Sequence, residues 1–285
     1  MPEGPEVETV RKELSPLISR TVKRIRLTEF SQNYPKYRQK QPEFDIFVNS
    51  TLDDIIRIGK FLIWRFVEVP NVILNHLGMS GRWGLIDGAV VPERDYKHPK
   101  VLVEMKNPPH AVFDDTRNFG QFRVFKSLEM VNNYSPIKKM GIDGLAQPFP
   151  TQRFADQLDL RSFIAKPIGE ALIDQRLVAG IGNIYKSEAL FEARIDPRKK
   201  VQDLSKNEKN RLGEAISFIL NKALRSMGSS IDVQPYTRPN GDFGEAQIWH
   251  RVYNRAGKSC PVCNKKIERI KQKGRSTFFC AQCQK

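Results

Sequence analysis

Four cysteines close to the C-terminal end of the sequence could bind a metal ion. They form two C-x-x-C pairs, CPVC at 260–263 and CAQC at 280–283, with sixteen residues between the pairs. This spacing is typical of a tetrahedral Zn²⁺ site, whereas two disulfides would suit a small secreted domain. No cysteine occurs elsewhere in the 285 residues. We therefore expect one structural zinc ion, bound by Cys260, Cys263, Cys280 and Cys283.

The first residues, MPEGPE, place a proline directly behind the initiator methionine and glutamates at Glu3 and Glu6. Proline fits the first turn of a helix, and glutamates there complement the helix dipole. Apolar residues follow at helical spacing, so the pattern predicts a helix over about 5–14. This interpretation accounts for the helix but leaves open whether Pro2 also has a chemical role.

The charge of the chain indicates a polyanionic partner. Its formal net charge is +15, and residues 251–285 alone carry ten Lys or Arg against the single acid Glu268. Such an excess favours nucleic acid or an anionic membrane surface. No apolar run approaches the ~20 residues that span a bilayer, and the N-terminus lacks the apolar core of a secretory signal. We expect an intracellular protein with a nucleic-acid partner and no membrane partner.

The elements that must position these residues differ between the two halves of the chain. Runs rich in β-branched and aromatic residues predict strands in the first half, which favours an antiparallel sandwich or barrel. A polar stretch at about 132–150 is the expected domain boundary. Helical periodicity follows it, with a capping box at Ser205 and Glu208. The predicted strands are 61–67, 72–77, 101–105 and 111–125, and the predicted helices are 168–178, 184–195 and the one that begins at Ser205 and ends near Gly228.

Two turns in the second half could bind phosphate. AGIGN at 179–183 joins two predicted helices, and it is either only a tight corner or an anion site at the N-terminus of the second helix. KQKGRS at 271–276 lies between the cysteine pairs and would present Lys273 and Arg275 on a zinc-bound hairpin.

Three separated segments resemble the formamidopyrimidine-DNA glycosylase and endonuclease VIII family: PEGPEVETVR at the N-terminus, DQRLVAGIGNIYKSEALF in the middle and the cysteine hairpin. The resemblance implies an α+β protein. Its parts would be an antiparallel β-sandwich catalytic domain with an N-terminal helix (1–134), a helix–two-turn–helix domain (150–228), a lesion-recognition loop (229–247) and a zinc finger (248–285).

The resemblance also implies the catalytic residues. Pro2 would be the nucleophile once Met1 is removed, because an α-amine with a pKa near ~8 is partly neutral at physiological pH. Glu3 would be the acid/base residue, and Lys60 would hold the phosphate beside the lesion, although a lysine that opens a strand is usually a solvated end. Glu6 matches a family position and either supports the site or caps the helix.

The DNA-binding residues implied by the resemblance fall into two sets. Asn183, Tyr253 and Arg275 would bind phosphates. Met79, Arg117 and Phe119 would fill the gap that the extruded nucleotide leaves in the duplex, and His76 would be a further DNA-binding residue. A Met and a Phe in strand-rich sequence are more often core residues, but both stand here in Gly-bounded, turn-like segments.

The expected function is excision of oxidised purines from duplex DNA by a monomer that also cleaves the strand at the abasic site. Gly4 departs from the leucine common in the purine-specific branch, so an oxidised-pyrimidine glycosylase of the endonuclease VIII type stays an alternative. The other alternative is a noncatalytic zinc-finger protein that binds damaged DNA, which would have no need for the set Pro2, Glu3 and Lys60.

Overall fold

The computed structural model describes residues 1–32, 41–88, 96–231 and 236–285. The chain divides into two compact units. The first contains Met1–Pro2, Glu6–Lys138 and Met227–Glu245, and the second contains Glu3–Pro5, Lys139–Ser226 and Ala246–Lys285. The N-terminal segment therefore contributes to both units.

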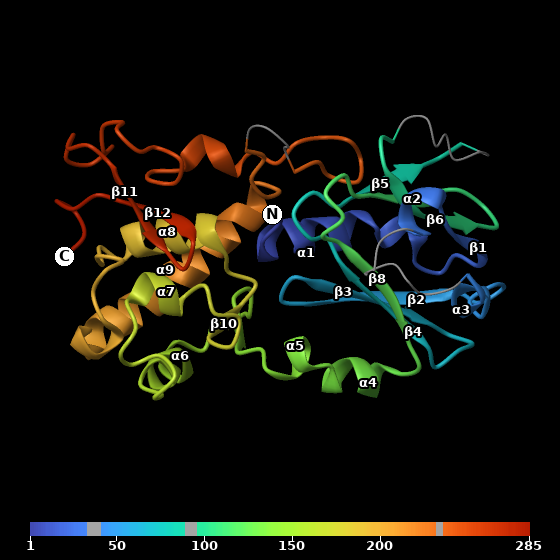
Figure 1. The fold of residues 1–285 in the computed structure, drawn as a ribbon, viewed down its shortest axis with the longest axis horizontal. Coiled ribbons are helices and arrows are strands. Elements are labelled where there is room, and N and C mark those ends of the chain that lie inside the picture. Colours follow the sequence, from blue (N-terminus) through green and yellow to red (C-terminus); the bar gives the residue numbers. More distant parts are fainter. Residues whose placement is uncertain (33–40, 89–95, 232–235) are drawn as a thin grey trace. The chain divides into compact units, whose positions relative to one another are not determined.

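Two four-stranded antiparallel sheets form the first unit (Figure 1). One sheet has the order β1-β6-β7-β5 and the other the order β2-β3-β4-β8. The strands are β1 (Val22–Leu27), β2 (Leu52–Ile58), β3 (Phe61–Phe66), β4 (Val72–His76), β5 (Arg82–Ile86), β6 (Pro99–Met105), β7 (His110–Asp114) and β8 (Gln121–Phe125).

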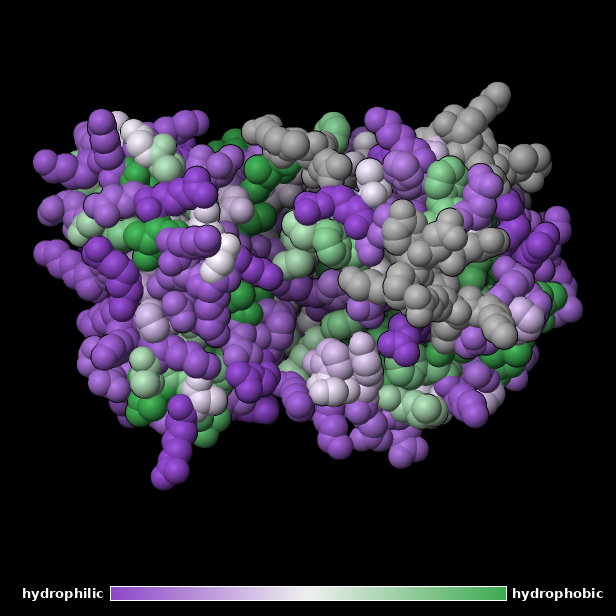
Figure 2. Space-filling model, in the orientation of Figure 1, coloured by the Kyte–Doolittle hydropathy of each residue, from purple (hydrophilic) through white to green (hydrophobic). Residues whose placement is uncertain are grey.

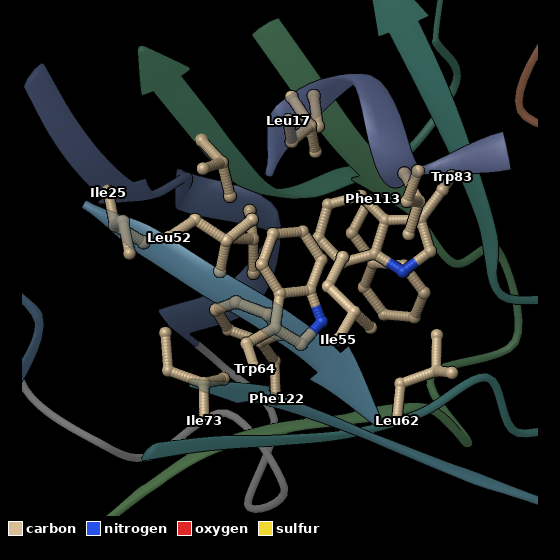
Figure 3. Packing of buried hydrophobic residues seen from close by; sticks show 14 of the residues in the cluster. Leu17, Ile25, Leu52, Ile55, Leu62, Trp64, Ile73, Trp83, Phe113 and Phe122 are labelled. Carbon is tan, nitrogen blue, oxygen red and sulfur yellow. The ribbon is translucent and has the colours of Figure 1, made fainter. Parts of the chain in front are cut away.

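A single hydrophobic core joins the two sheets. Trp83 on β5 packs against Trp64 on β3 with ring centroids 4.9 Å apart, and against Phe122 on β8 at 5.8 Å (Figure 3). Aromatic side chains bury large areas and prefer such tilted contacts. Because side chains from both sheets meet in one cluster, the unit is a β-sandwich and not a barrel.

Helices of the first unit flank the strands. Helix α1 (Gly4–Glu13) places Val7 and Val10 in the sandwich core, as its helical spacing predicts. The remaining helices are short: the 3₁₀ turn η1 (Ser15–Leu17), α2 (Glu29–Gln32), α3 (Pro42–Asp45), α4 (Leu128–Asn133) and α5 (Ser135–Lys138).

One strand prediction is wrong. The run 111–125 is not a single strand, because β7 ends at Asp114 and β8 begins at Gln121. Asp115 accepts a hydrogen bond from the backbone N–H of Gly120 (2.7 Å), which closes the intervening residues into a loop. The other three predicted strands correspond to β3, β4 and β6.

The second unit is mainly helical. Its longest helix, α9 (Lys206–Arg225), begins with the predicted capping box: Ser205 Oγ accepts from the N–H of Glu208 at 3.2 Å, and Glu208 Oε2 accepts from the N–H of Ser205 at 2.9 Å. The other elements are β9 (Ile142–Asp143), α6 (Thr151–Leu158), α7 (Ile168–Ala171), β10 (Val178–Ala179), α8 (Asn183–Glu192), the 3₁₀ turns η4 (Val201–Asp203) and η5 (Ala246–Trp249), β11 (Glu268–Gln272) and β12 (Arg275–Phe279).

The predicted helix over 168–178 is also wrong in its extent. Only Ile168–Ala171 is helical, and the chain then turns and enters β10, which pairs in parallel with β9. The side chain of Asp174 accepts a hydrogen bond from the N–H of Arg176 at 3.1 Å, an arrangement that favours a turn over helix continuation.

Strands β11 and β12 form the predicted hairpin between the cysteine pairs. Its two-residue turn, Lys273–Gly274, has positive φ at both positions (45° and 75°), which matches the twist of the strands. The surface of the second unit that faces the viewer in Figure 2 is mostly hydrophilic. Among the described residues, we find no helix with the length and hydropathy of a membrane span.

Candidate active site and nucleic-acid interface

The predicted nucleophile lies at the start of the chain, before α1. Pro2 is buried, and Met1, which precedes it, is 42% exposed. The Pro2 nitrogen is acylated while Met1 is attached, so removal of this exposed residue is what would free a secondary amine.

Glu3 is held by the backbone of the second unit. Its carboxylate is 2% exposed and accepts hydrogen bonds from the N–H groups of Gly182 (2.7 Å) and Ile184 (2.8 Å), with a longer one from Tyr185 (3.4 Å). These groups belong to the N-terminus of α8, where N–H groups lack helical partners and the helix dipole favours an anion. The carboxylate oxygens are thereby fixed in one orientation.

The prediction that a phosphate binds at the N-terminus of α8 is therefore wrong for these three N–H groups, because they donate to Glu3. The AGIGN turn does form an anion site, but the anion is the chain's own Glu3. The spacing of glycines alone could not reveal this, since Glu3 is about 180 residues away in the sequence.

Gly4 allows the N-terminal segment to approach this turn. Its N–H donates to the carbonyl of Gly180 at 2.7 Å, and a Cβ on Gly4 would lie 3.3 Å from the Cα and the carbonyl oxygen of Gly180. Such a distance is tighter than ordinary van der Waals contact. The glycine that departs from the usual leucine thus has a local packing reason.

Asn183, Tyr253 and Arg275 lie in the second unit around the hairpin. The Asn183 amide Nδ2 donates to the carbonyl of Ser276, next to Arg275, at 2.6 Å, and Asn183 acts to lower the pKa of Tyr253. Arg275 is exposed at the start of β12. Burial, followed by the nearby Glu3 charge, raises the pKa of Tyr253. The structure thus brings Asn183, Tyr253 and Arg275 into one neighbourhood of the second unit.

Lys60 is not a solvated strand end. It follows Gly59 (φ 57°) in the β2–β3 turn, and it is only 7% exposed. The side chain of Arg57 supports this turn by donating to the Gly59 carbonyl at 3.1 Å and to Glu8 Oε2 at 3.0 Å. The interpretation of Lys60 as a solvated lysine is therefore wrong, which leaves the predicted role in place as a hypothesis.

Three predicted gap-filling residues are exposed on two neighbouring loops of the first unit. Met79 is 40% and Phe119 44% exposed, and the guanidinium of Arg117 lies 5.4 Å from the Phe119 ring centroid. The ring of His76, at the end of β4, packs at a tilt against Phe61, with the ring centroids 4.7 Å apart. Met79 and Phe119 are therefore exposed and not core residues, as their turn-like segments predict.

A polar network fixes these two loops to each other. Ser80 Oγ donates to Asp115 Oδ1 at 2.7 Å and accepts from the N–H of Arg117 at 3.0 Å. Gly78 (φ 67°) packs so closely that a Cβ there would lie 2.4 Å from the Gly120 nitrogen. The loop that carries Met79 and the loop that carries Arg117 and Phe119 therefore form one surface.

Glu6 supports a loop as well as standing in the first turn of α1. Its carboxylate is 1% exposed and accepts from the N–H of Ser229 at 2.8 Å. This contact is at the beginning of the predicted lesion-recognition loop, 229–247. Residues 232–235 of that loop lie outside the described residues, so the prediction for the loop is untested there.

The four cysteines fit one zinc ion. Their sulfur atoms all lie within 4.8 Å of one another, with Cys260 Sγ to Cys283 Sγ at 3.8 Å and Cys263 Sγ to Cys280 Sγ at 3.4 Å. A tetrahedral ion with Zn–S bonds of ~2.3 Å requires sulfur atoms about 3.8 Å apart, whereas a disulfide requires ~2.05 Å. All four cysteines are free thiols, so the disulfide alternative is excluded.

Comparisons with known proteins agree along the whole chain. Residues 1–122 match the Formamidopyrimidine-DNA glycosylase N-terminal domain, residues 140–234 the Formamidopyrimidine-DNA glycosylase H2TH domain, and residues 257–285 the zinc finger found in FPG and IleRS. Proteins named formamidopyrimidine-DNA glycosylase from Rhodopseudomonas palustris (strain TIE-1) and Listeria monocytogenes serotype 4b (strain F2365) are 34% and 35% identical, each over all of both chains.

The chain belongs to the formamidopyrimidine-DNA glycosylase family.

Solved structures of family members have the same fold. Lactococcus lactis Fpg, in a complex with DNA that contains an abasic site, superposes with a TM-score of 0.83 at 31% identity and covers 99% of each chain. The MutM (Fpg) protein of Thermus thermophilus gives 0.83 at 31% identity over 99% of this chain and 98% of its own. The α+β fold with a β-sandwich, a helix–two-turn–helix domain and a zinc finger is thus confirmed.

Membership of this family establishes the class of enzyme. The protein is a DNA glycosylase of base-excision repair that acts on oxidised purines, with the abasic-site lyase activity of formamidopyrimidine-DNA glycosylases. A noncatalytic zinc-finger protein is accordingly not the favoured interpretation.

One buried acid of this glycosylase escaped sequence reasoning. Glu188 on α8 is fully buried and accepts hydrogen bonds from three successive N–H groups, those of Arg251 (3.0 Å), Val252 (2.9 Å) and Tyr253 (2.8 Å). Burial raises its pKa, and these hydrogen bonds oppose that rise. The sequence does contain a signal for this buried acid, because Glu188 lies within the apolar face of KSEALF, where a charged residue is unfavourable unless it is hydrogen-bonded.

Proposed function

We propose that Pro2, freed by removal of Met1, is the nucleophile of this glycosylase and that Glu3 is its acid/base partner. The observation that carries the proposal is the Glu3 carboxylate. It adjoins Pro2 in the chain, and amide hydrogen bonds of 2.7 and 2.8 Å orient it. A catalytic carboxyl needs this kind of fixed geometry.

The proposed chemistry begins with attack of the Pro2 amine on the sugar C1′. The nitrogen lone pair forms the N–C1′ bond as the bond from C1′ to the base breaks, and the nitrogen passes its N–H proton to the Glu3 carboxylate. The base leaves with the electron pair of the broken bond and takes up a proton from water. Proton donation to the ring oxygen, assigned to Glu3, opens the sugar and gives an iminium ion. Loss of a C2′ proton then expels the 3′ phosphate, and a second elimination expels the 5′ phosphate.

Phosphate binding is assigned to Lys60 in the first unit and to Asn183, Arg275 and Tyr253 in the second. The net charge of +15 supports a duplex DNA partner, because neutralising phosphates releases counterions. One homologue of known structure is MutM in complex with DNA that contains carbocyclic 8-oxo-G, which supports 8-oxoguanine as the substrate here.

Extrusion of the damaged nucleotide leaves a gap that Met79, Arg117 and Phe119 would fill. Their exposure and the connected loops support this assignment. His76 beside them would contact the DNA backbone. Action as a monomer inside a DNA-containing compartment stays a prediction.

Borohydride trapping tests the nucleophile. We expect a covalent adduct on a duplex with 8-oxoguanine opposite cytosine, because reduction converts the iminium ion into a stable amine. Pro2→Gly with Met1 retained should give no adduct, whereas a Pro2→Gly protein with a free N-terminal amine keeps a nucleophile. N-terminal mass must be measured for each protein.

Two other duplexes distinguish the outcomes. A dihydrouracil duplex belongs in the test because Lactococcus lactis Fpg has also been solved in a complex with DNA that contains an oxidised pyrimidine. Trapping only on that duplex would favour the pyrimidine substrate. If Met1 is absent and no covalent adduct forms with the 8-oxoguanine duplex, the dihydrouracil duplex or an abasic duplex, the proposed nucleophile is wrong.

A further inference from the structure

Lys186 is a buried cation that the proposed chemistry does not use. It lies on α8 with no exposed surface, three residues after Asn183. Its ammonium donates to Asn183 Oδ1 at 2.9 Å and to Thr277 Oγ1 on β12 at 2.7 Å. Both acceptors are neutral oxygens. Since burial of a charge is costly, a lysine retained in such a place needs an explanation.

The hydrogen bonds of Lys186 set the orientation of the Asn183 amide. An ammonium can only donate, so Asn183 must present its oxygen to Lys186. The Nδ2 group then points away and donates to the carbonyl of Ser276 at 2.6 Å. Both contacts agree on one orientation of the amide, and this orientation presents the Asn183 donor next to Arg275.

The second bond of Lys186 begins a directed chain into the hairpin. Thr277 Oγ1 accepts from Lys186 and donates to Gln272 Oε1 at 2.9 Å. Gln272 Nε2 in turn donates to the carbonyl of Pro197 at 2.9 Å. This chain runs in one direction only, from a donor at Lys186 to a backbone acceptor, and it ties β11 and β12 to α8.

The charges around Lys186 come from several elements. Burial lowers its pKa to about 7, the carboxylates of Glu3 and of Glu170 on α7 oppose this, and Arg275 on β12 adds to it. Tyr253 is a further titratable group at this place, since Asn183 and the charges of Glu3 and Arg275 affect its pKa. A phosphate beside Arg275 would offset the repulsion between the two cations and favour the protonated lysine.

We propose that Lys186 is a positioning residue for DNA binding: from inside the second unit it orients the Asn183 amide and fixes the strand that carries Arg275, so that one phosphate can meet both donors. The inference rests on the proposed phosphate-binding role of Asn183 and Arg275. Lys186 itself does not reach the DNA.

The first test measures binding of the full-length, zinc-loaded protein to a duplex with a tetrahydrofuran abasic analogue, which needs no proline chemistry. Lys186→Met keeps the unbranched side chain up to the ε position and removes the ammonium, and we expect it to weaken binding about tenfold, the scale of one hydrogen bond to a charged group. Thr277→Val should act in the same direction. The matched control is Lys209→Met, since Lys209 is also buried but pairs with Asp159.

The second measurement has a readout that general loosening of the structure would not change. Heats of binding near pH 7.5, compared in buffers of different ionisation enthalpy, report proton exchange. Wild type should take up protons when the duplex binds, and Lys186→Met should take up fewer. The Lys209→Met protein should behave as wild type, which separates Lys186 from the other titratable groups.

The outcomes separate this inference from the function on which it rests. If Arg275→Ala binds as tightly as wild type, the phosphate-binding role is wrong and the inference falls with it. If Arg275→Ala weakens binding while Lys186→Met matches wild type in affinity and proton uptake, only the positioning role is overturned. Should Lys186→Met fail to fold, Thr277→Val decides: wild-type binding by that variant overturns the proposal.

Discussion

At the scale of single residues, three buried carboxylates accept hydrogen bonds from backbone N–H groups. Glu3 holds the N-terminus of α8, Glu188 holds three N–H groups at 251–253, and Glu6 holds the N–H of Ser229. An isolated buried carboxylate is very unfavourable, so each of these acids is retained with hydrogen-bond donors around it. Each therefore fixes a loop that carries a proposed DNA-binding or catalytic residue, or leads to one.

His250 makes the stability of the second unit sensitive to acid. The ring is 8% exposed and packs edge-on against Trp249 and Tyr253. Burial lowers its pKa to about 4. Below the unfolded-state pKa of 6.5, the unfolded chain binds a proton that the folded chain does not, so this residue should reduce stability as the pH falls from 6.5 towards 4.

We predict that His250→Phe removes this acid sensitivity. Relative to the variant, wild type should lose about 3 kcal/mol of unfolding free energy between pH 7 and pH 4, from a pKa difference of about 2.5 at about 1.36 kcal/mol per unit. Denaturant unfolding of both proteins across this range measures the difference. Loss of zinc in acid affects both proteins, so it cancels. Parallel pH profiles would contradict the prediction.

At the scale of elements, the two exposed loops of the sandwich depend on one glycine. Gly78 has φ 67°, and a Cβ there would lie 2.4 Å from both the Gly120 nitrogen and the Phe119 carbonyl carbon. A side chain would thus be strained in the backbone and would also push the Met79 loop away from the loop with Arg117 and Phe119.

We predict that Gly78→Ala lowers excision from duplex DNA at least about tenfold but leaves strand cleavage at an abasic site in single-stranded DNA nearly unchanged. Only the duplex has a gap to fill. Gly257→Ala is the matched control, because Gly257 has φ 77° and nothing within 4 Å of its Cβ position. That control should lose about 1 kcal/mol of stability from strain and keep duplex activity. An equal loss on both substrates would argue against a gap-filling role.

Sequence periodicity predicted the elements better than it predicted their ends. The capping box and the apolar stripe of α9 depend only on residues close together in the sequence, so both could be predicted. The same holds for the strands β3, β4 and β6. The division of 111–125 depends on Asp115, whose acceptor role is visible only in three dimensions. The occupant of the α8 N-terminus could not be predicted either, since Glu3 lies far away along the chain.

The site residues also divide into those that local sequence patterns predict and those that depend on packing in three dimensions. Motif spacing identified the four cysteines because a tetrahedral ion imposes it, and the structure places their sulfurs accordingly. Lys186 and Glu188 were missed because a charged residue on a helix is usually solvated. Their burial arises from the packing of α8 against the hairpin and the segment that precedes it.

At the scale of the whole molecule, the three tryptophans allow the two units to be followed separately. Trp64 and Trp83 lie in the sandwich core, while Trp249 belongs to the second unit and donates to Ser226 Oγ at 3.0 Å. Among the described residues, the hairpin segment packs in a small cluster against Phe191 of α8, to which it contributes Val252, Ile267, Phe278 and two of the cysteines. Zinc binding must therefore supply part of its folding free energy.

We predict that chelation of zinc unfolds the hairpin and abolishes DNA binding, because Arg275 and the contacts of Asn183 lose their support, while the sandwich stays folded. In a Trp249→Phe protein the remaining fluorescence reports only the sandwich, and it should keep its emission maximum and its unfolding midpoint after chelation. In a protein with both Trp64 and Trp83 replaced by Phe, Trp249 should instead shift towards the emission of a solvated indole. Restored zinc should restore both signals and binding. If the sandwich signal changed together with Trp249, the two units would unfold as one cooperative body, and the zinc ion would stabilise the whole chain.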